Sequence, residues 1–394
     1  MPSSPPDSTD SPTPSATPSA EGAATRAREA LSRPLAWRSN AWLFVATVAS
    51  CFGTWVFFEG PSRAAAVHGL QYTASLLGIL LAHEFGHYIA ARIHGVDASL
   101  PFFIPLPILS PFGTMGAVIR MRSVIPTRRA LLDIGASGPL AGLALALPLY
   151  AWGVAHSEVR PLDGSEGGGI ELGSSLLLRL LDHLCAPPVP EGMDVFLSPV
   201  AYAGWAGMFV TMINLLPASQ LDAGHVAYSL FGRRQNQIAQ WVHRSMLAFF
   251  FVSVASFVAR DVRAGFGLYH LGRHIYNSQF WLLWFEVLAV LGTLSNREGQ
   301  DRIGIRPRVV ATAGLGLLVG LFHDRPSPVL WVAWFTGLGL LLAMEVRWGV
   351  LRSTSTLLDH PPTGAQPLGL GRTVIAVVTL LLFVLLFMPS PFAI

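Results

Sequence analysis

Three residues in one apolar stretch have the types and spacing that metal chemistry needs. His83, Glu84 and His87 lie within GILLAHEFGHYIAARIHG, residues 78–95. Four-residue spacing on a helix puts both imidazoles on one face, one turn apart. Two neutral imidazoles can bind zinc, and a catalytic zinc site keeps one position open for a water molecule. Glu84, next to the first histidine, could then take the proton of that water.

A purely structural role for these residues is a poor alternative. Two histidines and a glutamate inside an apolar helix cost free energy that a structural helix would not need to spend. The pattern therefore predicts a metal site rather than a helix that carries polar residues by coincidence.

A second stretch offers candidates for the third metal ligand. It reads NLLPASQLDAGH, residues 214–225, at the end of a later apolar run. Asp222 and His225 are three residues apart and could share one face of a helix, so either could bind the ion. A carboxylate lowers the charge of the cluster to +1, whereas a third histidine leaves +2. The smaller net charge costs less in a low-dielectric site, which favours Asp222.

The two motifs together resemble the site-2 proteases, zinc metalloproteases that cut their substrates within the membrane. The resemblance covers roughly residues 69–225, including the Pro-rich apolar segment after the first motif and the GASGPLAG run. It implies that the metal ligands are His83, His87 and Asp222. It also implies that Glu84 is the general base and that Asn214 orients or polarises the substrate carbonyl.

The sequence departs from the family's pattern at one position. Ala223 stands where the family has the first of two glycines after the aspartate. One added methyl group leaves the ligand chemistry intact, but the turn at this position is expected to be less tight.

The composition predicts an integral membrane protein. Hydrophobic residues make up 52% of the 394 residues and charged residues only 12%, which is about half the charged share of a typical soluble domain. The net charge is +3 and no basic stripe is interleaved with aromatic residues, so we expect no nucleic-acid partner. The two cysteines match neither a disulfide framework nor a cysteine-based metal site.

Apolar stretches of near-membrane length recur along the chain, and the fold class that they predict is an all-α polytopic membrane protein. About 20 residues are needed to cross the hydrocarbon core as a helix. We expect about nine transmembrane helices, at residues 41–58, 69–91, 130–152, 198–217, 244–259, 278–294, 309–322, 328–344 and 373–389.

The segment between the second and third stretches breaks this pattern. Residues 99–121 are apolar but contain four prolines and Gly113, which a continuous helix would not tolerate. Irregular backbone at membrane depth persists only where it is buried in protein or lines a wet cavity. The sequence therefore predicts a re-entrant, strand-like hairpin packed against the predicted helix 69–91, which carries His83 and His87. The alternative is an amphipathic surface loop.

Three regions follow from this pattern. Residues 1–40 are predicted to be a disordered Ser/Pro-rich tail with a basic juxtamembrane segment, because they contain few large apolar groups. Residues 41–225 are predicted to be the membrane-embedded metalloprotease core, and residues 226–394 to add further transmembrane helices. In this last region Glu286 lies within an aromatic-rich run; a buried ionisable residue suggests function, although we favour a structural role.

The basic residues predict how the chain is oriented. With nine spans and a cytoplasmic N-terminus, 19 of the 26 arginines fall on the inner side, as the positive-inside rule requires. We therefore expect a multi-pass protein of a bacterial cytoplasmic membrane. The expected function is zinc-dependent cleavage of transmembrane segments of protein substrates in the lipid bilayer, by metal-activated water. The alternative is a membrane metal-binding transporter or scaffold without proteolytic activity.

Overall fold

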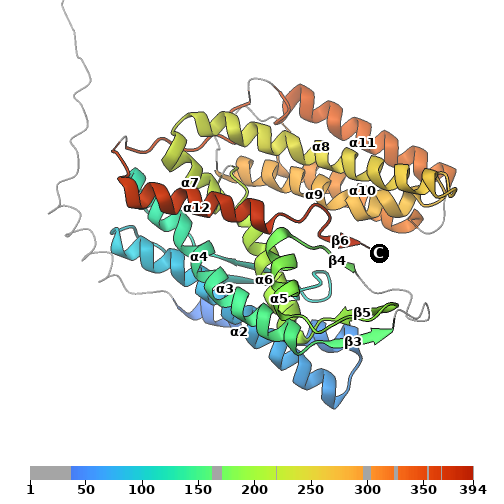
Figure 1. Ribbon diagram of the computed structural model, residues 1–394. Helices are drawn as coiled ribbons and strands as arrows, with labels where there is room; N and C mark the ends of the chain where they lie inside the picture. The colour runs from blue at the N-terminus through green and yellow to red at the C-terminus, as the bar shows by residue number, and fades with distance from the viewer. Residues whose placement is uncertain are drawn as a thin grey trace, which may run out of the picture.

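The structure is a computed structural model of the 394-residue chain (Figure 1). It describes residues 37–161, 171–218, 220–295, 303–323, 327–352, 355–364 and 366–393. Most of the tail predicted at 1–40 lies outside these described residues.

Helices dominate the described part of the chain, and each of the predicted apolar stretches lies wholly or mostly in one of them. The nine helices that carry these stretches are α2 (Arg38–Glu59), α3 (Arg63–Ile93), α4 (Arg128–Ala155), α6 (Pro199–Asn214), α8 (Arg234–Arg263), α9 (Leu271–Ser295), α10 (Ile305–Phe322), α11 (Pro328–Trp348) and α12 (Leu370–Leu386). Two shorter helices, α5 (Leu176–Cys185) and α7 (Asp222–Phe231), were not predicted. Their apolar runs are too short to stand out in a scan for membrane spans.

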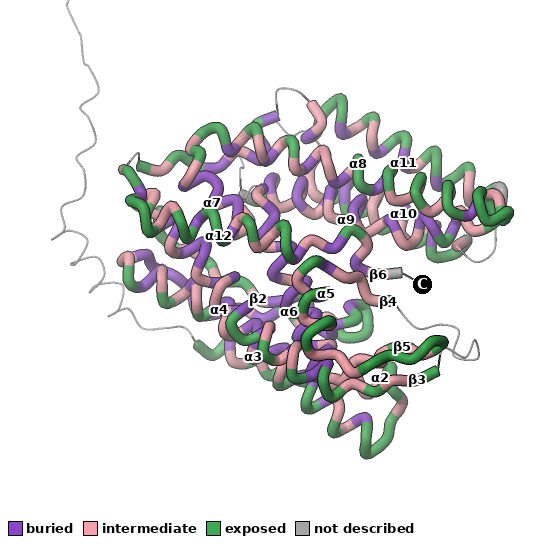
Figure 2. Tube along the Cα trace, in the orientation of Figure 1, coloured by how far each residue is buried: buried purple, intermediate pink, exposed green. Residues whose placement is uncertain are grey.

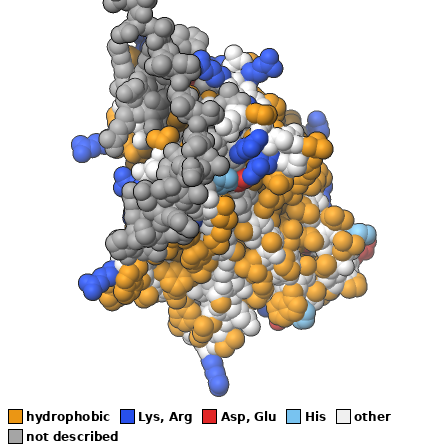
Figure 3. All heavy atoms as spheres, turned by 90° about the vertical axis from the view of Figure 1, so that its left-hand side faces the viewer, with side chains coloured by type: hydrophobic (Ala, Val, Ile, Leu, Met, Phe, Trp, Pro, Cys, Tyr) orange, Lys and Arg blue, Asp and Glu red, His pale blue; other side chains and the backbone are white. Residues whose placement is uncertain are grey.

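Five helices in the described residues are long and apolar enough to cross a membrane: α2, α3, α4, α8 and most of α11. The 16 residues of α6 fall short of this length, and α12 is a shorter apolar helix. Hydrophobic side chains cover most of the described surface in the view of Figure 3. These features fit a membrane protein, while the number of nine spans stays a prediction.

Short antiparallel strand pairs interrupt the helices. Within the Pro-rich segment, β1 (Phe102–Pro105) pairs with β2 (Thr114–Val118), and the register shifts between Phe103 and Pro105. Between α4 and α6, β3 (Glu158–Pro161) pairs with β5 (Met193–Phe196). Near the C-terminus, β6 (Phe392–Ala393) pairs with β4 (Glu171–Leu172). The last two pairings were not predicted from the sequence.

The centre of the molecule is formed by α3, α4 and α6, which pack against one another, and α7 packs on α4. Buried residues follow these helices in Figure 2. Close approach is possible because small residues face each other. A Cβ at Gly86 of α3 would lie 2.5 Å from the backbone oxygen of Ser137 in α4, and a Cβ at Gly204 of α6 would lie 2.8 Å from the Tyr150 backbone. These glycines therefore let the three helices of the core approach one another closely.

The C-terminal helices enclose a buried charged cluster that includes Glu286. Arg308, at the start of α10, is fully buried and donates to both carboxylate oxygens of Glu345 at 2.7 and 3.1 Å. Its Nε also lies 3.5 Å from a Glu286 carboxylate oxygen. Buried charges persist where they are paired, so Glu286 belongs to an ion cluster that ties α9, α10 and α11 together.

Candidate metal centre

The first part of the site lies in the middle of α3. This helix begins after Ser62, whose hydroxyl accepts a hydrogen bond from the Ala65 N–H at 2.9 Å, as an N-cap residue does. His83, Glu84 and His87 are 4–6% exposed. The two imidazole rings lie 4.8 Å apart, so both point to the same side of the helix.

The second part comes from the start of α7. Asp222 is the first residue of this helix, and its Oδ2 lies 3.2 Å from the Nε2 atoms of both His83 and His87. The two Nε2 atoms are 3.1 Å apart. The first turn of a helix carries a partial positive charge from its free N–H groups, so this position stabilises the Asp222 carboxylate.

These three atoms have the spacing of a metal-binding triad. Tetrahedral zinc with bonds of about 2.0–2.1 Å places its ligand atoms about 3.3–3.4 Å apart, close to the separations found here. Asp222 Oδ2 is buried and has no hydrogen-bond partner among the described residues. Within the part of the chain that the structure describes, these are also the only three His, Cys, Asp or Glu residues grouped closely enough to hold an ion.

The protonation of His87 supports the same interpretation. Its Nδ1 lies 2.7 Å from the backbone oxygen of Ile134 in α4. A carbonyl can only accept a hydrogen bond, so Nδ1 must carry the hydrogen, and the neutral ring then has its lone pair on Nε2. This lone pair points at Asp222 and His83. Metal-binding histidines are oriented in this way by the group that binds their other ring nitrogen.

Glycines of α4 provide the space for both histidines. A Cβ at Gly138 would overlap the imidazole of His87, and a Cβ at Gly142 would lie 3.2 Å from His83 Nδ1. A Cβ at Gly135 would lie 3.0 Å from the backbone oxygen of Asp222. One face of α4 therefore forms the wall against which all three candidate ligands pack.

Glu84 and Asn214 complete the site. The Glu84 carboxylate lies beside the backbone of Ile119, immediately after β2. Asn214, the last residue of α6, places its Nδ2 3.3 Å from His83 Nε2. The structure thus brings together the five residues that the resemblance assigns to the site.

His225 faces away from this group. Its Nδ1 lies 2.8 Å from His360 Nε2, and the His360 ring stacks on Tyr228 with centroids 4.2 Å apart. Asp222, rather than His225, is therefore the residue that meets the histidine pair.

The alanine after Asp222 causes no conformational conflict. Ala223 lies in the first turn of α7 and is fully buried. Ile108 is the only non-glycine residue with positive φ among the described residues. A helical φ suits alanine as well as glycine, so the sequence departure at this position does not disturb the backbone.

Sequence reasoning missed the parts of the site that are not themselves reactive. The Ile134 carbonyl that orients His87 gives no signal in the sequence, because any residue supplies a carbonyl. Gly138 belongs to the GASGPLAG run of the family resemblance, but its contact with His87 was not predicted. The spacing of Gly135, Gly138 and Gly142 at helical intervals was the available signal.

Comparison with known proteins agrees with the geometry. Residues 71–254, which include both motifs, match the family described as peptidase family M50. This part of the chain is a peptidase family M50 domain. The resemblance to the site-2 proteases that the motifs suggested is thereby confirmed.

Curated relatives match part of the chain as well. The chain is 33% identical over 172 residues to the probable zinc metalloprotease EGY2, chloroplastic, of Arabidopsis thaliana. It is 35% identical over 167 residues to the probable zinc metalloprotease EGY1, chloroplastic, of the same plant. Each alignment covers 42% of this chain, but only 29% and 30% of the two relatives. No solved structure matches.

Proposed function

We propose that this protein is a zinc metalloendopeptidase that cleaves transmembrane segments of protein substrates within the lipid bilayer. The observation that carries this proposal is that His83 Nε2 and His87 Nε2, in the middle of the apolar helix α3, meet Asp222 Oδ2 of α7 within 3.1–3.2 Å. The M50 match and the names of the EGY relatives support the same activity.

Zinc fits the donor set, with His83, His87 and Asp222 as its ligands. When bound, zinc lowers the pKa of a coordinated water molecule and polarises the scissile carbonyl. With one carboxylate ligand, the zinc ion and its ligands carry a net charge of +1. This costs less in a buried site than the +2 that a third neutral histidine would leave.

Glu84 and Asn214 supply the proton transfer and the orientation. Glu84 is adjacent to a ligand without being one, so its carboxylate is available to accept a proton from the attacking water and to pass it to the leaving amine. The Nδ2 group of Asn214, beside His83, is placed to donate a hydrogen bond to the substrate carbonyl. A donor of this kind stabilises the negative charge that develops on the oxygen.

A transmembrane substrate must present an unwound segment, since the carbonyls of a helix are engaged in its own hydrogen bonds. The β1–β2 hairpin, which we place at membrane depth as a re-entrant element, can receive that segment by strand addition. Two features of β2 support this role. The backbone that follows it, at Ile119, lies beside Glu84, and Met115 and Val118 are 67% and 52% exposed.

We further propose nine spans with a cytoplasmic N-terminus, in a bacterial cytoplasmic membrane. The support is the distribution of arginines, 19 of 26 on the inner side. In this orientation α3 and α6 both run inward, and their site residues meet in the inner leaflet.

The experiment that tests the function separates metal binding from catalysis. The purified protein should bind about one zinc ion, and Glu84→Gln should retain it while losing peptide-bond cleavage, because glutamine cannot accept the proton. Membrane proteomes of cells with the parent and with Glu84→Gln would then differ in the cleaved substrates. Equal turnover by the two proteins would overturn the assignment, and zinc flux into vesicles in its place would favour the transporter.

A further inference from the structure

The short helix α5 is held against two longer apolar helices. It begins after Ser175, whose hydroxyl accepts a hydrogen bond from the Leu178 N–H at 3.2 Å, and it packs on α4 and α12. Leu178 is buried, and the Asp182 carboxylate accepts a hydrogen bond from the Tyr150 hydroxyl of α4 at 2.6 Å. One face of α5 is therefore fixed to the core of the protein.

A second face of α5 carries three exposed leucines. Leu176, Leu180 and Leu184 are 59%, 52% and 67% exposed. Each follows the previous one by four residues, so on a helix they form one stripe about 80° wide. We call these three residues the leucine stripe. Three large apolar side chains gathered on one face indicate a surface that contacts an apolar partner.

A third face of α5 is basic. Arg179 and His183 are exposed and also four residues apart, so they share one side of the helix. We call these two residues the basic face; it borders the leucine stripe on the side away from the core. Helices that lie in a membrane interface combine an apolar face with a basic one in this way. The long arginine side chain can reach the headgroups from such a position.

The level at which α5 meets α4 suits a membrane interface. α4 is one of the helices long and apolar enough to cross a membrane. Tyr150 lies five residues before its end, or about 7.5 Å along the axis. Two residues further on, Trp152 is 54% exposed and stacks on His156. Exposed tryptophans are enriched where acyl chains meet headgroups, and interfacial helices lie about 5–10 Å deep at that boundary.

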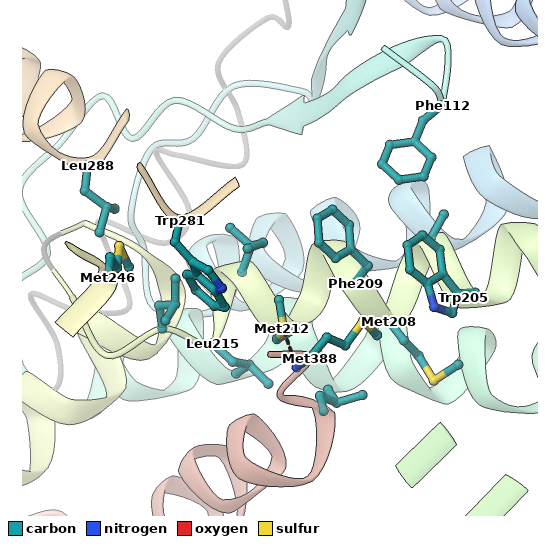
Figure 4. Close-up of a cluster of buried hydrophobic side chains, with 14 of the residues drawn as sticks. Phe112, Trp205, Met208, Phe209, Met212, Leu215, Met246, Trp281, Leu288 and Met388 are labelled. Carbon is teal, nitrogen blue, oxygen red and sulfur yellow. Dashed lines mark hydrogen bonds between the residues drawn. The ribbon is translucent and has the colours of Figure 1, made fainter. Parts of the chain in front are cut away.

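The start of α5 also lies beside the end of α12. The N–H of Gly173, three residues before α5, donates to the Pro391 carbonyl at 2.8 Å. The chain between α12 and Pro391 is itself fixed in the core, because the Met388 N–H donates to Met212 Sδ at 3.1 Å, as Figure 4 shows. Near this end, α12 exposes further apolar side chains, at Leu381, Val384 and Leu385. The leucine stripe therefore belongs to a region whose apolar helices already face outward.

We propose that α5 is an interfacial helix that binds the lipid bilayer, with the leucine stripe among the acyl chains of one leaflet and the basic face at the phosphate headgroups. Two observations favour lipid as the partner: α5 packs on apolar helices near their ends, and the groups that border the stripe suit anionic phosphates. In the proposed orientation the leaflet is the outer one. This inference goes beyond the proposed function and holds whether or not the protein cleaves peptide bonds.

Spin labels on single cysteines test where the leucine stripe lies. The full-length protein carries Cys185→Ala and is reconstituted in nanodiscs of phosphatidylethanolamine and phosphatidylglycerol; Cys51 is buried and stays unlabelled. Labels are attached to Leu176→Cys, Leu180→Cys and Leu184→Cys, and thermal melting confirms that each variant folds. Power saturation then measures collisions with oxygen, which concentrates in acyl chains, and with a water-soluble nickel chelate. The logarithm of the oxygen-to-nickel accessibility ratio should be positive at all three positions.

The basic face provides the matched controls, because its residues are exposed on the same helix. Labels on Arg179→Cys and His183→Cys should give a negative logarithm, so the sign should change with position around α5. A negative value at all five positions would overturn the proposal, since the leucine stripe would then face water. A positive value at all five would also overturn it, because the whole helix would then lie among the acyl chains.

The same labels detect the competing occupant, a second copy of the chain. If two copies met at the leucine stripe, labels at Leu180→Cys would be inaccessible to both reagents. Labels on the two molecules would also show dipolar coupling at short range. That pair of results would refute lipid as the partner, whereas high oxygen accessibility without coupling supports it.

Discussion

The variant Gly138→Ala tests the metal centre directly, because the His87 imidazole occupies the space that this glycine leaves. In Gly138→Ala, the new methyl group would overlap the His87 imidazole, whereas non-bonded atoms prefer about 3.5 Å or more. The obstructed group is a side chain, so the ring can rotate away while α3 and α4 stay packed. His87 then loses both its Ile134 hydrogen bond and its place in the triad.

Gly138→Ala should change zinc affinity much more than it changes the free energy of unfolding. Loss of a group that merely orients a ligand lowers metal affinity about 10-fold to 100-fold, so displacement of the ligand itself should lower it by more than about 100-fold. Alanine is about 1 kcal/mol more favourable than glycine inside a helix, which offsets part of the cost of rearrangement. We therefore expect metal loss with a free energy of unfolding within about 1 kcal/mol of the parent.

Alanine substitutions at two further glycines should lower zinc affinity less, because the added Cβ lies farther from its nearest neighbour. In Gly142→Ala the Cβ lies 3.2 Å from His83 Nδ1, which requires a small shift and should reduce zinc affinity modestly. In Gly78→Ala it lies 3.6 Å from Leu145 Cδ2, an ordinary contact, so zinc content should not change. Zinc is measured by mass spectrometry after equal dialysis and by chelator competition, and stability by thermal melting. Parental zinc affinity in Gly138→Ala, or a ranking that ignores these distances, would refute the reasoning.

The remaining predictions concern the third ligand, a buried histidine and the charged cluster. Asp222→Ala should lower zinc affinity by orders of magnitude, whereas His225→Ala should leave zinc content near that of the parent; the opposite ranking by metal analysis would move the ligand to His225. Burial lowers the pKa of His360 below 6.5, so stability should be complete above pH 6.5 and fall below it by up to about 1.4 kcal/mol per pH unit. His360→Asn should flatten that part of the denaturation profile, and an unchanged profile would exclude His360 as its source. Glu345→Ala should cost about 3–5 kcal/mol by leaving Arg308 buried without its bidentate partner, and Arg308→Met in the same chain should recover much of it; a double variant as unstable as the single one would argue against the pair.

The local features of this protein could be read directly from its sequence. Helical spacing placed His83 and His87 on one face, and apolar runs located the helices that carry them. Both depend on neighbouring residues within one element, whose periodicity is fixed by the backbone geometry. The helix bounds observed for α3 and α4 therefore lie within a few residues of those expected, apart from six extra residues at the start of α3.

Contacts between elements that are far apart in the sequence were harder to predict. The sequence offered both Asp222 and His225, and charge and resemblance favoured the aspartate, but only the packing of α7 on α4 shows which one faces α3. The pairing of β4 with β6 could not be predicted from the sequence, because it involves only two residues on each strand. Glu286 was recognised as unusual, yet its partner Arg308 lies on another helix.

Tertiary structure decided these points for one physical reason. Apolar periodicity specifies that a face will be buried, but not against which partner. The partner is selected by the fit of many side chains at once, such as the space that Gly138 leaves for His87. That fit depends on residues far apart in the chain, so it exists only when the helices are packed together.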